Sequence, residues 1–156
     1  MERHWYEDVP ISRLLREARG AYGDAARRAL AGAGFDDIPQ HGGAVLAGLD
    51  WRSPGPDFTG QADSVAFLRL SKQRSSQLID TLVLRGYLER RIDPEDRRRM
   101  GVRLTDRGRA AAAAVRAAVE AIDARLAQRL TAEELSGLRV GLSALAEIRD
   151  EVGGDD

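Results

Sequence analysis

Residues 69–103, RLSKQRSSQLIDTLVLRGYLERRIDPEDRRRMGVR, decide the fold of this chain. Ser71 is a residue type that caps helix N-termini and Gly86 is a type that ends helices, so a helix is predicted between them. Alternating apolar residues follow at 87–91 and again at 100–104, which predicts two paired strands. The connection between them starts with an Asp-Pro turn and is too long for a tight hairpin. The stretch therefore predicts a helix and a two-stranded wing with arginines at its tip.

The same stretch carries the positive charge of the chain. Residues 69–103 contain 10 basic and five acidic residues, whereas each flanking segment contains seven basic and 10 acidic ones, and the whole chain has a net charge of -1. A basic island between acidic flanks indicates one surface for a polyanion. The alternative interpretation is a solvated, charged hairpin.

Outside this stretch, apolar residues recur at spacings of three and four, which predicts further helices. These are expected at about 11–30, from Asp36 or Asp37 with Pro39 in the first turn, at about 61–70, from Thr105 onwards, and from Thr131 onwards. Thr131 and Glu134 have the spacing of a capping box. Residues 51–60 are rich in proline and glycine and are expected to form a loop. The predicted fold is mainly α with a small β-wing.

A helix–turn–helix followed by a wing offers two elements that can contact DNA. The second helix enters the major groove with its N-terminus first, and its early side chains meet base edges. Arginine suits guanine and glutamine suits adenine. The helix residues expected at DNA are Ser71, Lys72, Gln73, Arg74, Ser76 and Gln77. Taken alone, these residues are equally consistent with the solvent-exposed face of an ordinary helix.

The wing tip favours the DNA interpretation. Arg97, Arg98 and Arg99 are adjacent there. Nothing in folding requires three neighbouring like charges, and a narrow minor groove attracts inserted arginine. Asp96 is expected to orient an arginine through a charge-assisted hydrogen bond.

These residues resemble the MarR family of winged-helix transcription regulators. The wing of that family has Asp-x-Arg followed, after three residues, by Val-x-Leu-Thr, and this chain has Asp96, Arg98 and then 102–105 at that spacing. The family's turn and recognition helix, with Leu-Ser-Lys, Leu-Val-Asp-x-Leu and Gly-Leu-Val-Glu-Arg, are matched at 70–72, 78–82 and 86–90. One departure is Ser64, which stands where a leucine is common.

The resemblance implies a homodimer in which the first helix and the last two helices of each chain interlock. The whole chain, 1–156, is then one MarR-like domain, with a winged helix-turn-helix head at 36–104 and a helical dimerisation region at 8–31 and 105–151. The expected dimer contacts are Leu14, Val115, Val119, Ile122, Leu126, Leu138, Leu142 and Leu145. An independent argument is the long apolar face of 115–126; the alternative is that this face packs against the final helix of the same chain.

Other chemistries have little support in the composition. The chain has no cysteine, which excludes disulfides and Cys-ligated zinc. His4 and His41 are the only histidines and lie far apart in the sequence, so neither a metal site nor a cofactor is expected. There is no P-loop, no nucleophile motif and no long apolar run, and the N-terminus lacks the apolar core of a signal peptide. A cytoplasmic protein that is not an enzyme and does not enter a membrane is expected.

The main hypothesis is a dimeric repressor that binds a pseudo-palindromic double-stranded operator and is released by a small effector. The alternative is a winged-helix interaction module that no longer binds DNA; a small enzyme on a helical dimer is a third hypothesis. Trp5, Tyr6 and Trp51 either line a pocket for an aromatic effector, as the resemblance implies, or pack under the first helix. The sequence does not name the pocket residues.

Overall fold

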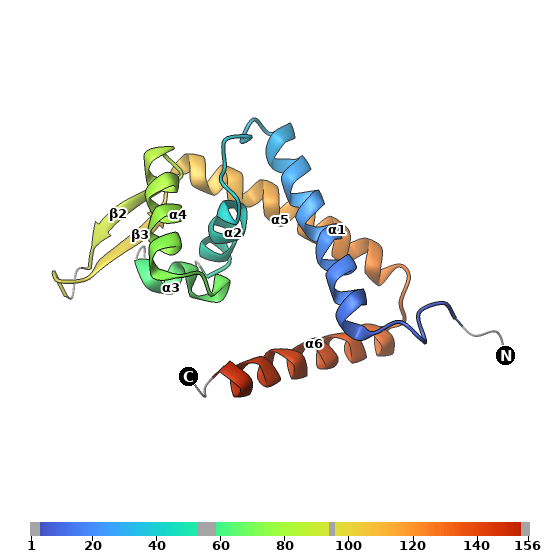
Figure 1. Ribbon diagram of the computed structural model, residues 1–156. Coiled ribbons are helices and arrows are strands. Elements are labelled where there is room, and N and C mark those ends of the chain that lie inside the picture. The colour runs from blue at the N-terminus through green and yellow to red at the C-terminus, as the bar shows by residue number, and fades with distance from the viewer. Residues whose placement is uncertain (1–3, 53–58, 94–95, 154–156) are drawn as a thin grey trace. The chain divides into compact units, whose positions relative to one another are not determined.

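The computed structural model describes residues 4–52, 59–93 and 96–153, which form helices and one small sheet (Figure 1). In chain order these are α1 (Ile11–Gly32), α2 (Gly42–Arg52), β1 (Thr59–Gly60), α3 (Gln61–Val65), the 3-10 turn η1 (Ala66–Leu68), α4 (Lys72–Leu84), β2 (Leu88–Ile92), β3 (Met100–Leu104), α5 (Asp106–Ala127) and α6 (Ala132–Gly153). The chain divides into two compact units, residues 1–119 and 120–156, and α5 runs through the boundary. The expected fold class, mainly helical with a small wing, is confirmed.

The sheet has three antiparallel strands in the order β1-β3-β2. The wing strands pair in the register Leu88 to Leu104 and Ile92 to Met100. The third strand was missed, because a two-residue strand leaves no periodic pattern. It pairs Thr59 with Val102, and residues 53–58 of the expected loop lie outside the described residues.

Most of the predicted helix boundaries are confirmed by their capping bonds. The hydroxyl of Ser71 accepts a hydrogen bond from the backbone N–H of Arg74 at 3.3 Å. Gly86, with φ of +75°, ends α4 in the left-handed conformation that glycine adopts without strain. Thr131 and Glu134 form the predicted reciprocal capping box, because each side chain accepts a bond from the backbone N–H of the other residue at 3.2 and 2.8 Å.

The start of α2 differs from the prediction. The helix begins at Gly42, not near Asp37, and His41 just before it has φ of +68°. The Asp37 carboxylate is occupied elsewhere, since it accepts hydrogen bonds from the Tyr87 hydroxyl and from Arg107 at 3.1 Å. A side chain held by distant partners is not free to cap the local backbone.

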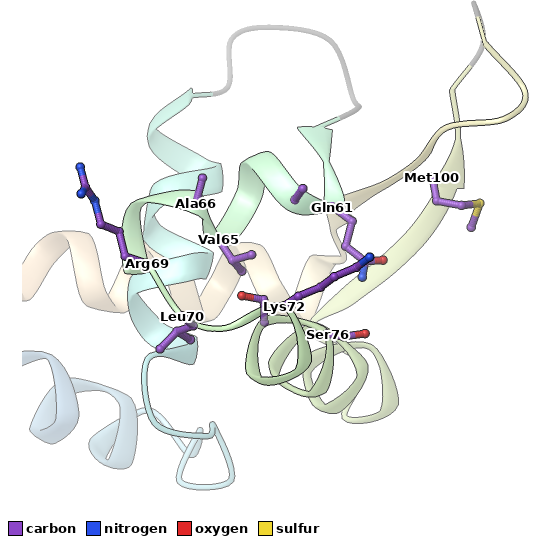
Figure 2. A pocket seen from close by; sticks show the side chains of 10 residues that line it. Gln61, Val65, Ala66, Arg69, Leu70, Lys72, Ser76 and Met100 are labelled. Carbon is purple, nitrogen blue, oxygen red and sulfur yellow. The ribbon is translucent and has the colours of Figure 1, made fainter. Parts of the chain in front are cut away.

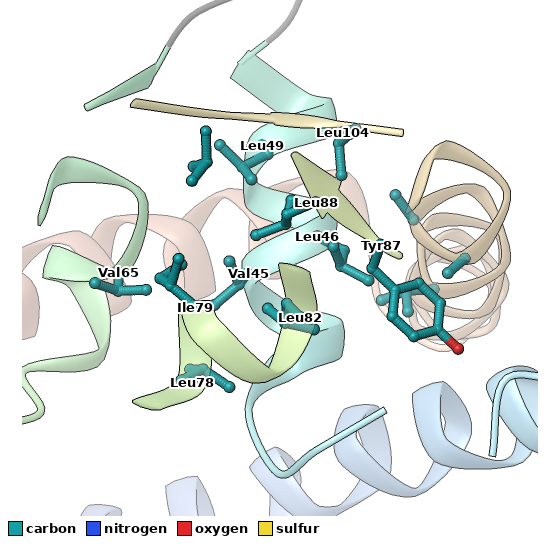
Figure 3. Close-up of a cluster of buried hydrophobic side chains, with 14 of the residues drawn as sticks. Val45, Leu46, Leu49, Val65, Leu78, Ile79, Leu82, Tyr87, Leu88 and Leu104 are labelled. Carbon is teal, nitrogen blue, oxygen red and sulfur yellow. The ribbon is translucent and has the colours of Figure 1, made fainter. Parts of the chain in front are cut away.

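The core of the first unit lies where α2, α4, the wing strands and the start of α5 meet. Figure 3 shows the leucine and valine side chains of α2 facing those of α4, with Leu88 and Tyr87 from the base of the wing beside them. Full burial of each such side chain contributes roughly 1.5–3 kcal/mol. The fully buried members are Val45, Leu46, Ile79, Leu82, Tyr87, Leu88 and Val102. This shared core fixes the wing and α4 in one body.

The second unit is largely helix α6. Its described side chains are exposed apart from Leu135, which is half-buried. The exposed set includes the apolar residues Leu138, Val140, Leu142, Leu145 and Ile148. Among the described residues, no helix is long and apolar enough to cross a membrane.

Candidate nucleic-acid interface

Helix α4 presents polar side chains at its N-terminal end. The 3-10 turn η1 is followed by Arg69, whose left-handed φ of +48° redirects the chain before Ser71. Ser71, Lys72, Gln73, Arg74 and Gln77 are exposed, and Ser76 is half-buried. Leu78, Ile79 and Leu82 anchor the opposite face in the core. The predicted polar face therefore lies outward, where a large ligand has access to it.

A hollow lies between the start of α4, helix α3 and strand β3 (Figure 2). Its walls are apolar side chains from α3 and η1, with polar groups around them. The lining residues are Gln61, Ala62, Val65, Ala66, Arg69, Leu70, Lys72, Ser75, Ser76 and Met100. In Figure 2 the Lys72 and Gln61 side chains are both among those that line the hollow.

The wing tip is organised by backbone hydrogen bonds. The Asp93 N–H donates to the Arg99 carbonyl at 3.0 Å, and the Arg99 N–H donates to the Asp96 carbonyl at 2.9 Å. The Asp96 carboxylate accepts a bond from the N–H of Arg98 at 3.0 Å. Asp96 was expected to orient an arginine through a charge-assisted hydrogen bond, and the bond observed comes from the backbone N–H of Arg98. Asp96 shapes the turn from which the neighbouring arginine side chains project.

The three arginines of the tip differ in their contacts. All are exposed, and among the described residues neither the Arg97 nor the Arg98 guanidinium has an ion-pair partner. Arg99 instead reaches Asp93 at 3.8 Å and Asp63 at 3.9 Å. Arg97 and Arg98 thus offer their positive charge outward, whereas that of Arg99 faces acids of the same unit.

Ion pairs along the wing hold its strands and its neighbour α4. Arg90 of β2 pairs with Asp80 of α4, and Arg103 of β3 pairs with Glu89 of β2. The hydrogen bond from Arg103 lowers the pKa of Glu89, and the nearby charge of Arg91 acts in the same direction. These pairs are partly exposed, so each one is expected to contribute little to stability.

Tyr87 connects the base of the wing to two other segments. Its hydroxyl donates to the Asp37 carboxylate, and Arg107 of α5 donates to that hydroxyl at 2.9 Å. The Arg107 guanidinium also lies over the Tyr87 ring, 4.6 Å from its centroid, which is cation–π geometry. The tyrosine bond is the main cause that lowers the pKa of Asp37, and burial is the main cause that raises the pKa of Tyr87.

This cluster was missed in the sequence. The available signal was a tyrosine between the helix-ending Gly86 and Leu88, at the start of the predicted strand. A tyrosine that is buried there needs a partner for its hydroxyl. The sequence does not show which acid provides it.

Comparison with known proteins finds a match to the segment that contains α3, α4 and most of the wing. The model of the MarR family matches residues 61–99, which contain α3, the turn, α4 and the wing up to its tip. This segment of the chain is therefore similar to the MarR family.

Solved structures of MarR-like proteins share the fold along almost the whole chain. MepR from S. aureus, in its DNA-binding conformation, has a TM-score of 0.75 at 22% identity over 89% of this chain and 98% of that one. CouR, bound to a 23-mer DNA duplex, has a TM-score of 0.68 at 22% identity over 94% and 99%. MarR from E. coli, in its apo form, has a TM-score of 0.63 at 23% identity over 89% and 98%. No curated protein matches the sequence.

The predicted DNA residues all lie in the first compact unit. Those on α4 and those on the wing belong to residues 1–119, and α4 and the base of the wing share one core. Ser64, the departure from the family pattern, is buried, and its hydroxyl donates to the Gln61 carbonyl at 2.7 Å. The bond satisfies the hydroxyl locally, so a serine is accommodated in α3. The contacts of these residues with DNA stay a prediction.

The residues predicted for dimerisation fall in several environments. Val115 is buried at 4% exposure in the core of the first unit, and Val119 packs against that core. Leu14, Ile122 and Leu126 are half-buried, whereas Leu138, Leu142 and Leu145 are exposed. Burial of Val115 is therefore already complete within one chain. The dimer role of the set stays a prediction.

An apolar groove lies between α1, α2, α5 and η1. Three aromatic side chains, from Tyr22, Trp51 and Phe67, line it together with small residues and Val115 and Val119. Trp5 and Tyr6 are exposed, and their rings lie edge to face with 6.0 Å between the ring centroids. Of the aromatic residues singled out in the sequence, Trp51 is one that lines this groove.

Proposed function

We propose that this chain is a transcription repressor that binds double-stranded DNA as a homodimer through α4 and the wing. The observation that carries the proposal is the pair of exposed surfaces on one compact unit. The polar start of α4 and the exposed side chains of Arg97 and Arg98 belong to the same unit, in which α4 and the base of the wing share one core. Such a pair suits simultaneous contact with a major groove and an adjacent minor groove.

Related folds support the proposal. MepR is described in a DNA-binding conformation and CouR in a complex with a DNA duplex, and both share the fold of this chain. The family consists of transcription regulators, and we propose accordingly that the chain is not an enzyme. A regulator of this kind acts where the chromosome is, so we place it in the cytoplasm.

The dimer follows from the exposed apolar residues of α6. Leu138, Leu142 and Leu145 recur on one face and are between 39% and 44% exposed in the single chain. A second copy that covers this face removes apolar surface from water and gives a two-fold arrangement of heads for a pseudo-palindromic operator. Light scattering should give roughly 34 kDa, twice the 17.0 kDa of one chain. A stable monomer at micromolar concentration would contradict the dimer.

The apolar groove is where we place the effector. No charged side chain occurs among its described lining residues, and Tyr22, Trp51 and Phe67 suit a flat aromatic molecule. Phe67 is part of η1, which leads into the turn before α4. A ligand that displaces Phe67 can therefore shift the start of the recognition helix and weaken DNA binding.

The experiment is a DNA mobility-shift assay on the duplex upstream of the chain's own gene. The parent protein should retard that duplex in the presence of excess unrelated DNA, and an aromatic carboxylate or a neutral aromatic analogue should release it. Release by the neutral analogue in preference to the carboxylate would agree with the uncharged lining. If the protein retards neither the upstream duplex nor unrelated DNA, the alternative is supported, in which the chain is an interaction module that no longer binds DNA.

A further inference from the structure

Arg99 joins the wing to the first helix of the helix–turn–helix. Its side chain reaches Asp93, at the start of the wing tip, at 3.8 Å, and Asp63, in α3, at 3.9 Å. These acids are far apart in the sequence and belong to different elements. The guanidinium between them therefore bridges the wing and α3.

Two further observations support the bridge. The Asp93 side chain is mostly buried and its backbone N–H donates to the Arg99 carbonyl at 3.0 Å, so this end of the bridge is fixed. At the other end is Gly60, where a Cβ atom would lie 2.6 Å from the Asp63 carboxylate and 3.6 Å from the Arg99 guanidinium. A side chain at Gly60 would thus crowd the space that the pair occupies.

The bridge lies beside the hollow of the DNA-binding surface. Gln61 of α3 and Met100 of β3, both labelled in Figure 2, line that hollow. Asp63 is two residues after Gln61, and Arg99 directly precedes Met100. Asp63 is 66% exposed. An exposed acid on this side of the head repels phosphates, so on charge alone it opposes DNA binding.

We propose that Arg99 is a positioning residue, which sets the angle of the wing to α3 and α4 through Asp63 and Asp93 and is not itself inserted into DNA. The inference rests on the proposed DNA-binding function. It divides the three arginines of the tip into two that contact DNA, Arg97 and Arg98, and one that holds the wing in place. It also gives the acid at position 63 a role that favours binding.

The two possible roles of Asp63 predict opposite effects of Asp63→Asn on the affinity for DNA. If Asp63 acts only through its charge, Asp63→Asn removes a repulsion and should tighten binding to DNA. If Asp63 holds Arg99, the same change should weaken binding about two- to fivefold, the effect of losing one exposed ion pair. Affinity is measured by fluorescence anisotropy on the duplex that the parent binds. Asp24→Asn on α1, where the acid pairs locally with Arg27, is the matched control for loss of one negative charge.

A double-mutant cycle gives the second readout. In the Arg99→Ala background, Asp63→Asn should have no further weakening effect through this bridge, because the ion pair with Arg99 is already gone. Arg99→Lys, which keeps a positive charge near both acids, should recover part of the affinity that Arg99→Ala loses. Melting temperatures identify any variant that loses affinity by unfolding, and Arg99→Lys then decides the outcome.

Tighter or unchanged binding by Asp63→Asn, or additive effects in the cycle, would overturn the positioning role. A parent protein that binds no upstream duplex at all would instead remove the proposed function itself. The two failures are therefore distinguishable.

Discussion

The carboxylate of Asp96 accepts a hydrogen bond from the backbone N–H of Arg98 at 3.0 Å. The acid thus shapes the turn that carries the arginine, and its own negative charge is tolerated at a surface proposed to meet phosphates. Asp96→Ala should weaken DNA binding by about 1 kcal/mol, because a looser tip must be ordered on binding. Asp96→Asn retains the accepting oxygen and should bind at least as tightly as the parent. Isothermal titration with the upstream duplex measures both; tighter binding by Asp96→Ala would show that only the charge matters.

The start of α4 should distinguish base contacts from phosphate contacts. Arg74→Ala and Gln77→Ala are each expected to cost about 1–3 kcal/mol on the cognate site and less on random DNA, as loss of a base contact does. Lys72→Ala, in the lining of the hollow, should weaken binding to both duplexes alike if the lysine contacts phosphate. Competition titrations with single-base variants of the site provide the measurement. Equal losses on cognate and random DNA for Arg74→Ala would refute its base contact.

The Tyr87 cluster predicts a dependence of stability on pH. The pKa of Asp37 is lower in the folded chain than in the unfolded one, so the folded state holds fewer protons on this group. Its contribution to stability is therefore fully present above the unfolded pKa of an aspartate and is lost as the pH falls through the folded value. Tyr87→Phe should lower the free energy of unfolding by about 1 kcal/mol at neutral pH, through loss of the hydroxyl bonds.

The difference between parent and Tyr87→Phe should shrink in acid, where Asp37 is protonated in both proteins. Urea denaturation at a series of pH values follows this difference. A difference that stays constant down to strongly acidic pH would contradict the assigned role of the tyrosine bond.

Replacement of two glycines by alanine should change the stability of the fold in opposite directions. At Gly108 in α5, a Cβ atom would lie 2.0 Å from the backbone oxygen of Tyr87, so Gly108→Ala forces the helix away from the base of the wing. A loss of about 1–3 kcal/mol is expected, as for other overpacked sites. At Gly20 in α1 no atom lies within 4 Å of such a Cβ, and Gly20→Ala should stabilise by up to about 1 kcal/mol. Thermal denaturation compares the pair; a neutral Gly108→Ala would contradict the close approach.

Local signals in the sequence were sufficient for the helix ends and the wing. The Ser71 cap, the Gly86 stop and the Thr131–Glu134 capping box each involve residues a few positions apart, and all are present in the structure. The alternation of Met100, Val102 and Leu104 indicated β3, which pairs with β2. Such features depend on neighbouring residues, which the sequence displays directly.

The features that were missed depend on residues distant in the sequence. Asp37 looked like a helix cap, but Tyr87 and Arg107 occupy its carboxylate. Arg99 looked equivalent to its two neighbours, but Asp63 and Asp93 lie beside it. Neither partner can be chosen from periodicity or composition. The contacts with DNA and with a second copy stay predictions, since the structure is that of a single chain.

The central claim is that the head binds a specific duplex through α4 and the wing. It is tested most directly by titrating the upstream duplex and a scrambled duplex of the same composition with parent and Arg98→Ala, between about 50 and 200 mM salt. The parent should prefer the upstream duplex by about 10³-fold or more, with affinity falling steeply as salt rises. Arg98→Ala should bind more weakly, with a salt slope reduced by about one and an unchanged melting temperature. Equal affinity of Arg98→Ala and parent at every salt concentration, or equal affinity of the parent for both duplexes, would contradict the account.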